Sequence, residues 1–178
     1  MKSSFKLTVL AAVIAVLLLA ISVNAQTVPA KSWRLGLGIE TGVPTGVATL
    51  GATFTLGGTA RLQYGLSNNF ALTLTTGGYH FFPKKNPVTG IRYQSYGEIP
   101  VKIGFKEFFA NNIYFGGEIG TASEKLESGW GPTRLDLSPA LGYANQHWDF
   151  AVHYENFSRH GEDSFGLVNL RVAYGFGL

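Results

Sequence analysis

The chain has 178 residues, with 14 basic and 11 acidic side chains and no cysteine. The absence of cysteine excludes disulfides, thiolate metal sites, thiol nucleophiles and the acylated cysteine of a lipoprotein. Two of the lysines belong to the N-terminal signal described next, and the remainder carries 12 basic and 11 acidic side chains. A balance so close to neutral gives no electrostatic case for nucleic-acid binding.

Residues 1–25 have the features of a cleaved secretory signal peptide. Two lysines precede an uncharged, mostly apolar run over Leu7–Val23, and small residues occupy positions 23 and 25, which signal peptidase reads. An uncleaved membrane anchor is the alternative, because the run is near the lower length limit for a spanning helix. We predict export, removal of the signal and a single domain over 26–178.

Eight stretches of the remaining chain alternate with a period of two between two kinds of residue. One of the interleaved sets holds 38 positions without a charge, and the other, counted with the residues that directly flank the stretches, holds twelve charged residues. Side chains on a β-strand alternate between faces, so each stretch predicts a strand with one apolar and one polar face. In chain order, the stretches span 33–41, 54–64, 70–76, 99–105, 113–119, 135–143, 148–154 and 168–178.

The connections between these stretches alternate between short and long. Three are tight and contain asparagine, which tolerates positive φ and hydrogen-bonds to its own backbone: 66–69, 109–112 and 144–146. Four are longer and hold proline, glycine and most of the remaining charges: 42–53, 83–93, 123–133 and 158–164. Short turns at one end and longer loops at the other are typical of outer-membrane barrels, with both termini on the periplasmic side.

Aromatic residues gather at both ends of the predicted strands. In a membrane barrel such rings form two girdles at the lipid–water interfaces. We therefore expect them to face the interfaces, and the set includes Tyr79, Phe81, Phe108, Tyr114, Phe157 and Phe165.

Side-chain volume indicates which face points outward. A soluble lipocalin-like barrel also has eight strands, but its interior is apolar. The interior of an eight-stranded barrel is just wide enough for side chains or one small ligand. The uncharged set is bulky and glycine dilutes the charged set, so we predict an all-β, closed, eight-stranded antiparallel up-and-down transmembrane barrel with the uncharged set in lipid.

The charged set is then expected to line a narrow lumen. Six of its members are basic and six are acidic, so they can pair across the lumen and close it. The predicted lumen network consists of Arg34, Glu40, Arg61, Glu98, Lys102, Lys106, Glu118, Arg134, Asp136, Asp149, Glu155 and Arg171.

The signal ending, the asparagine turns and the closing run Leu170–Leu178 resemble the small eight-stranded outer-membrane β-barrel proteins, such as the OmpA-type transmembrane domain and the OmpX-like barrels. The resemblance implies residence in the outer membrane of a Gram-negative-type cell and contact with lipid and lipopolysaccharide. It also implies that the barrel-assembly machinery recognises the last strand through Tyr174, Phe176 and Leu178. The group usually ends on an aromatic residue, so Tyr174 and Phe176 are expected to supply the ring. No peptidoglycan-binding domain is expected to follow.

One group of residues could support catalysis. His153, Glu155, Ser158 and His160 supply a Ser–His–acid combination, which acts by nucleophilic attack when its members are within hydrogen-bond reach. Some eight-stranded barrels are lipid A deacylases, and 153–158 is similar to their C-terminal strands. However, Asn156 stands where that family has a histidine two residues before the serine. We therefore expect no enzymatic activity, no cofactor and no metal, and interpret His153 and Glu155 as lumen lining.

The expected function is a structural or interaction role, carried by the extracellular loops of a monomer. Two alternatives remain open, namely a narrow channel through the lumen and a lipid A-modifying enzyme. Lys84 and Lys85 could bind lipopolysaccharide phosphates or be solvated loop charges.

Overall fold

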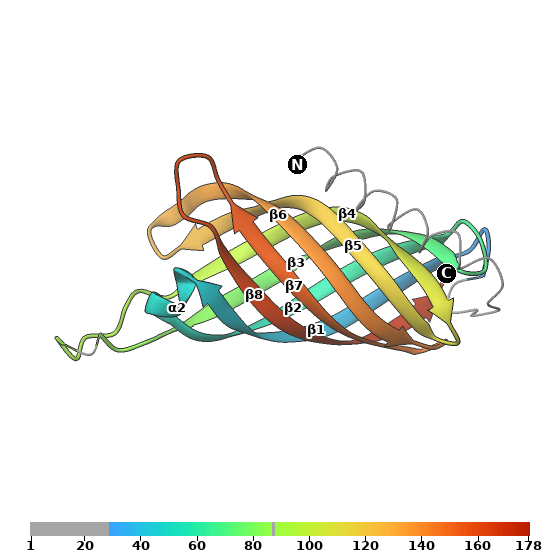
Figure 1. The fold of residues 1–178 in the computed structure, drawn as a ribbon, viewed down its shortest axis with the longest axis horizontal. Helices are drawn as coiled ribbons and strands as arrows, with labels where there is room; N and C mark the ends of the chain where they lie inside the picture. Colours follow the sequence, from blue (N-terminus) through green and yellow to red (C-terminus); the bar gives the residue numbers. More distant parts are fainter. Residues whose placement is uncertain (1–28, 87) are drawn as a thin grey trace, which may run out of the picture.

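The computed structural model describes residues 29–86 and 88–178, and the predicted signal peptide lies outside these ranges. The described residues form eight strands: β1 (Trp33–Gly46), β2 (Ala52–Gly65), β3 (Phe70–Pro83), β4 (Tyr96–Ala110), β5 (Ile113–Leu126), β6 (Gly129–Ala144), β7 (Trp148–Ser158) and β8 (Phe165–Gly177). Each strand pairs antiparallel with the next, and β8 returns to pair with β1 (Figure 1). The predicted closed up-and-down barrel is confirmed. Within the same ranges, no helix is long and apolar enough to cross a bilayer.

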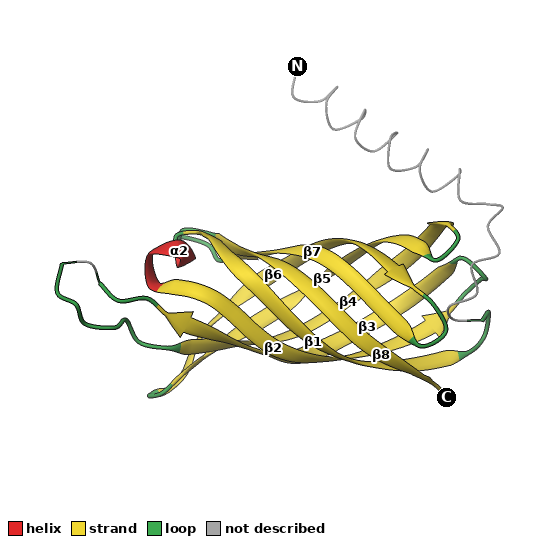
Figure 2. Cartoon of the chain, turned by 90° about the horizontal axis from the view of Figure 1, so that it is seen from below, coloured by secondary structure: helices red, strands yellow, loops and turns green. Residues whose placement is uncertain are grey.

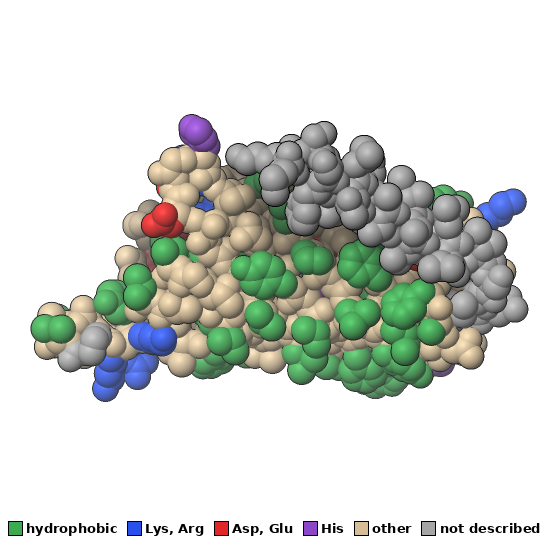
Figure 3. All heavy atoms as spheres, viewed as in Figure 1, with side chains coloured by type: hydrophobic (Ala, Val, Ile, Leu, Met, Phe, Trp, Pro, Cys, Tyr) green, Lys and Arg blue, Asp and Glu red, His purple; other side chains and the backbone are tan. Residues whose placement is uncertain are grey.

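The two sets of alternating residues lie on opposite sides of the barrel wall. All 38 positions of the uncharged set are exposed or half-buried on the outer wall. Eleven of the twelve charged residues are buried inside, and Arg134 is half-buried. Hydrophobic side chains are spread over the visible face of the outer wall in the space-filling view (Figure 3). The period of two therefore separates an apolar exterior from a charged interior along the whole wall.

The three tight turns lie at the end of the barrel where β1 begins and β8 ends (Figure 1). Asn112 has a positive φ of 65° between β4 and β5. In the turn between β6 and β7, the Asn145 side-chain oxygen accepts hydrogen bonds from the backbone N–H groups of His147 and Trp148, at 2.9 and 2.8 Å. Asparagine thus supplies the two properties for which it was identified in sequence.

Two of the four connections at the other end differ from the loops that the sequence predicts. The segment between β1 and β2 is a one-turn helix, α2 (Ala48–Gly51). The predicted loop 123–133 is wrong, because β5 and β6 continue as a hairpin with only two residues between them. Cross-strand contacts between polar side chains extend this hairpin: Ser123 Oγ lies 3.0 Å from Thr133 Oγ1, and Lys125 Nζ lies 4.8 Å from the centre of the Trp130 ring.

The remaining two connections are loops. The β3–β4 loop (Lys84–Ser95) extends beyond α2 at this end of the molecule (Figure 2), and the β7–β8 loop spans 159–164. We call this the loop end and the opposite one the turn end.

The interior has three layers, because apolar side chains close the charged lumen at both ends. A loop-end plug consists of Ala48, Ala52, Tyr79, Phe81, Ala122, Phe157, Phe165 and Leu167. A turn-end plug consists of Phe108, Tyr114, Ala144 and Ala151. Six aromatic residues that we expected in the girdles therefore lie inside the barrel. Strand parity explains the error: each lies next to an outward-facing residue and so points inward.

Candidate functional site

The charged lumen places side chains from all eight strands around a few buried carboxylates. Nearest the turn end, Asp149 on β7 contacts Lys106 Nζ and lies 3.2 Å from Arg171 Nη1 and 4.0 Å from Arg61 Nη1. The Tyr114 hydroxyl donates a hydrogen bond of 2.7 Å to the same carboxylate. This carboxylate is therefore compensated by three cations and a hydroxyl, as a buried charge requires.

Glu118 on β5 is the second such carboxylate. It accepts hydrogen bonds from Arg61 Nη2 at 3.1 Å and from the hydroxyls of Thr73 and Thr75 at 3.0 and 2.6 Å. Gly104 on the neighbouring strand makes room for it, because an added Cβ there would lie 2.7 Å from Glu118 Cγ. The inward glycines thus accommodate charged side chains in a barrel too narrow for two large groups at the same level.

Glu40 on β1 is the third buried carboxylate with several partners. Its oxygens lie 3.1 Å from Arg171 Nε and 3.0 Å from His153 Nε2, and they accept hydrogen bonds from Thr59 at 2.7 Å and from the Tyr79 hydroxyl at 2.9 Å. Arg171 therefore joins Glu40 to Asp149 and links the two groups of ion pairs.

Towards the loop end, Lys102 is the cation that links several carboxylates, as Arg171 does nearer the turn end. Its ammonium contacts Glu155 and lies 3.6 Å from Asp136 and 3.9 Å from Glu118. Above it, Arg134 lies 3.7 Å from Glu98, 2.6 Å from Glu124 and 3.0 Å from Glu162 of the β7–β8 loop. Ion pairs thus follow the axis of the barrel through most of its length.

Arg34 is the predicted lumen residue that lies apart from these pairs. It is buried near the turn end against Gly175, where an added Cβ would lie 1.9 Å from Arg34 Nε. None of its guanidinium nitrogens has a hydrogen-bond partner within the described ranges. Glycine at position 175 therefore leaves the space that this guanidinium occupies.

The structure does not bring the candidate catalytic residues together. Ser158 lies five positions from His153 on β7, so the two side chains project from opposite faces of the wall. His160 is exposed in the β7–β8 loop. Of the four residues, only His153 and Glu155 share the lumen, where His153 Nδ1 lies 3.9 Å from Glu155 Oε1.

Ser138 is a partner of His153 that the sequence reading missed. Its hydroxyl lies 3.1 Å from His153 Nδ1, while His153 Nε2 faces Glu40, so the order of contacts is that of a Ser–His–acid relay. Both Ser138 and His153 are buried, which leaves the hydroxyl without an approach for a substrate. The signal available in sequence was the inward parity of Ser138 on β6.

Glu40, His153 and Glu155 also offer three ligand atoms within 4.8 Å of one another, a spacing that could hold a metal ion. Both carboxylates already pair with cationic side chains, Glu40 with Arg171 and Glu155 with Lys102. A metal ion would therefore meet two positive charges at this position.

The β3–β4 loop carries a second kind of charged cluster. Lys84, Lys85 and Arg92 lie on it without any acidic residue in the same segment, and Lys85 pairs directly opposite Arg92. Lys84 Nζ donates to the Thr49 carbonyl at 2.7 Å. Within 29–86 and 88–178, no carboxylate forms an ion pair with any of these three side chains. Lysine and arginine side chains stand out on this loop in Figure 3.

The three residues of the predicted assembly signal lie on the outer face of the last strand. Tyr174, Phe176 and Leu178 are all exposed there. The Tyr174 ring packs edge-on against Trp148 at 5.3 Å and against Phe176 at 5.0 Å between centroids.

No protein-family model and no curated protein matches the chain. Solved structures do match it. Ail, the attachment invasion locus protein of Yersinia pestis, is 13% identical with a TM-score of 0.55, over 83% of this chain and 99% of that chain. The N-terminal β-barrel domain of Pseudomonas aeruginosa OprF is 12% identical with a TM-score of 0.52, over 79% and 97%. The chain has the fold of the small outer-membrane barrels.

Two further structures add to this likeness. Pseudomonas aeruginosa OprG is 11% identical with a TM-score of 0.50, over 85% of this chain and 97% of that chain. A second structure of Ail holds the heparin analogue sucrose octasulfate. At such low sequence identity these likenesses show the fold alone. They agree with the resemblance identified from the sequence.

Proposed function

We propose that the chain is an integral outer-membrane protein, sealed along its axis, that acts through its loop end. The observation that carries this proposal is the outer wall, on which all 38 positions of the uncharged set are exposed or half-buried. In water such a surface would be an aggregation liability, whereas in a bilayer it is the expected exterior of a closed barrel. The turn end, where β1 begins and β8 ends, then faces the periplasm.

Membrane insertion is tested by carbonate extraction and by electrophoresis with and without boiling. The protein is expected to stay with the membrane pellet and to migrate differently when folded. Release into the soluble fraction together with unchanged mobility would contradict the proposal. A protease that reaches an added C-terminal tag on intact cells would contradict the proposed orientation.

The sealed lumen follows from its three layers. An ion that crossed the barrel would have to pass the loop-end plug, the network of ion pairs and the turn-end plug. We therefore propose negligible conductance in planar bilayers. Discrete openings that change when Arg61 or Glu118 is neutralised would favour the narrow channel instead.

The loop end is proposed to bind phosphate groups of lipopolysaccharide through the β3–β4 loop. Three cations without an acidic partner create a positive surface, and two of them face each other across the loop. Directly opposed like charges are unfavourable unless an anion lies between them. Sucrose octasulfate on Ail supports this proposal, since that protein of the same fold holds a polyanion.

Binding is tested on the folded protein with the triple variant Lys84→Gln/Lys85→Gln/Arg92→Gln. Lys125→Gln/Arg159→Gln is the matched control, because it removes charges from other segments of the same end. The triple variant is expected to lose binding to lipopolysaccharide while the control retains it. Dephosphorylated lipopolysaccharide and heparin identify the group recognised. Equal binding by all proteins would overturn the proposal.

We also propose that the protein has no enzymatic activity, because Ser158 faces away from His153 and Ser138 is buried. Mass spectrometry of lipid A from expressing cells is expected to show no change. A mass change that is lost in Ser158→Ala or Ser138→Ala would establish a lipid-modifying enzyme and identify its nucleophile.

For assembly, we propose that the outer face of β8 supplies the recognition signal. Replacing both Tyr174 and Phe176 by alanine is expected to reduce the folded fraction in cells while refolding of the purified chain in detergent is retained. Equal reduction in both settings would indicate a loss of stability instead.

A further inference from the structure

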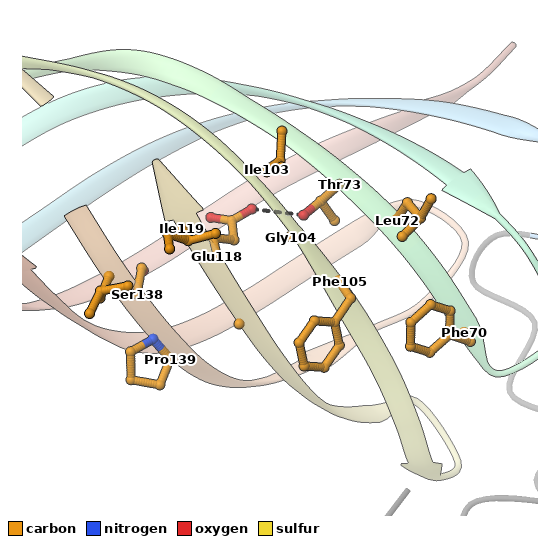
Figure 4. Close-up of a pocket in the computed structure, with 12 residues that line it drawn as sticks. Phe70, Leu72, Thr73, Ile103, Gly104, Phe105, Glu118, Ile119, Ser138 and Pro139 are labelled. Carbon is orange, nitrogen blue, oxygen red and sulfur yellow. Dashed lines mark hydrogen bonds between the residues drawn. The ribbon is translucent and has the colours of Figure 1, made fainter. Parts of the chain in front are cut away.

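The outer wall is hollowed where four neighbouring strands meet its surface. A groove of about 710 Å³ crosses β3, β4, β5 and β6, and Figure 4 shows its lining. The outward side chains that border it include Leu72, Ile103, Phe105, Ile119, Leu137 and Pro139. None of these side chains carries a charge or a polar group, so the groove is a continuous apolar surface.

A row of three paired residues explains why the wall is hollow here. Phe105 pairs with Gly117, and Gly117 pairs with Pro139 on the next strand. Most other outward positions of the wall hold a larger side chain. Gly117 has none, so backbone alone forms the floor of the groove. An added Cβ on Gly117 would lie 3.2 Å from Phe105 Cε1, which shows that the ring leans over the glycine.

The polar groups behind the floor are satisfied from the inside. Glu118 and Thr73 also border the groove, but their side chains are directed into the lumen and hydrogen-bond to each other at 3.0 Å, as Figure 4 shows. The groove therefore presents hydrocarbon to its occupant, and its depth comes from the missing side chain at position 117.

We propose that this groove binds one acyl chain of a phospholipid from the leaflet on the turn side. The inference rests on the proposed placement of the barrel in a membrane. The groove is continuous with the apolar outer wall, which faces lipid in the proposed placement. Lipid hydrocarbon is therefore what contacts it. Its rim is formed by the Phe70 and Phe105 rings, which stack with centroids 5.8 Å apart where β3 begins at the turn end. A concave, narrow surface fits a flexible chain, whereas the convex and bulky wall of a second barrel would not fill it.

The experiment uses the full-length protein in bilayers of phosphatidylethanolamine and phosphatidylglycerol that contain a trace of phospholipid with a photoreactive acyl chain. Cross-linked peptides are mapped by mass spectrometry. Gly117→Leu fills the groove, and Gly58→Leu is the matched control. Gly58 is also an outward strand glycine, and an added Cβ there would meet only the Gly38 carbonyl, at 3.8 Å. Ile103→Trp, with Val101→Trp as its control, fills the groove without changing a glycine.

Cross-links are expected to concentrate on the bordering residues and to fall there several-fold in Gly117→Leu and Ile103→Trp, but not in either control. Even labelling around the whole outer wall, unchanged by Gly117→Leu and Ile103→Trp, would overturn the proposed binding in the groove. It would leave the proposed membrane placement unaffected. Absence of labelling anywhere on the outer wall would instead refute the membrane placement. Labelling of the groove that rises when the protein is diluted in the bilayer would show that a second barrel occupies it.

Discussion

The lumen and the β3–β4 loop both contain arginine and lysine side chains, but the surroundings of these side chains are opposite in the two regions. In the lumen, Arg171 is fully buried and lies within 3.2 Å of two carboxylates. In the loop, Lys85 and Arg92 are exposed and face each other without an acid nearby. The comparison separates charges that the fold needs from charges that are available to a partner.

The physical reason is the cost of desolvation. A charge inside the barrel has lost its water, so its energy depends on the counter-charges around it, and removing one partner strands the others. A charge on the loop keeps its water and contributes little to folding. Substitution in the lumen should therefore affect stability first, and substitution in the loop should affect binding first.

The largest effect is expected for Arg171→Met. The methionine leaves Glu40 and Asp149 buried with one cation fewer, and loss of one partner of a buried pair costs about 3–5 kcal/mol of unfolding free energy. Urea unfolding in lipid vesicles, followed by tryptophan fluorescence, measures the change. Arg159→Met is the control, because its pair with Glu162 is exposed and is worth at most about 1 kcal/mol. Equal losses in the two variants would contradict the distinction between lumen and loop-end charges.

The second effect concerns the loop. Near an anionic surface each cation contributes about 1 kcal/mol, so the triple variant of Lys84, Lys85 and Arg92 should lose roughly 3 kcal/mol, or about 100-fold, of affinity for lipopolysaccharide. Its unfolding free energy should stay within about 0.5 kcal/mol of the parent. Titrations at two salt concentrations measure the electrostatic share of the affinity. A large loss of stability would show that the loop charges also hold the fold.

The strands and their faces could be predicted because an apolar exterior and a charged lumen impose a period of two along the wall. Trp33 to Thr41 keeps its parity throughout, and the structure places every second residue outward. Where the outer face is no longer apolar, that signal ends. The β5–β6 hairpin therefore escaped prediction: cross-strand contacts such as Ser123 with Thr133 extend it, and they depend on register.

Register also limited what could be said of the site. Ser138 meets His153 because β6 and β7 lie side by side at that level, which the residue types alone do not reveal. The groove depends on Phe105, Gly117 and Pro139 falling in one row across three strands. Tyr114 is a different case: its position near a strand end favours a girdle, whereas its parity in the sequence points inward, and the structure follows the parity.

The third prediction tests whether the lumen charges act as pairs. Arg61→Met and Glu118→Gln each remove one side of a 3.1 Å ion pair, whereas the double variant removes both. The double variant should be more stable than the sum of the single losses predicts, by a coupling energy of about 0.5–3 kcal/mol. The same unfolding experiment on all four proteins gives this energy. Strict additivity would mean that Arg61 is held mainly by its other neighbours, including Asp149 at 4.0 Å.

The smallest effect is expected where a pair is created rather than removed. Arg92→Glu places a carboxylate directly opposite Lys85, and changing opposed like charges to opposite ones is worth about 0.2–1 kcal/mol. The loop should become slightly more protected from hydrogen exchange, while binding to lipopolysaccharide falls below that of Arg92→Gln because a negative charge now repels phosphate. Hydrogen exchange and binding titrations measure the two effects. If the paired loop bound as well as the parent, the absence of an acid beside Lys85 and Arg92 would have no bearing on ligand binding.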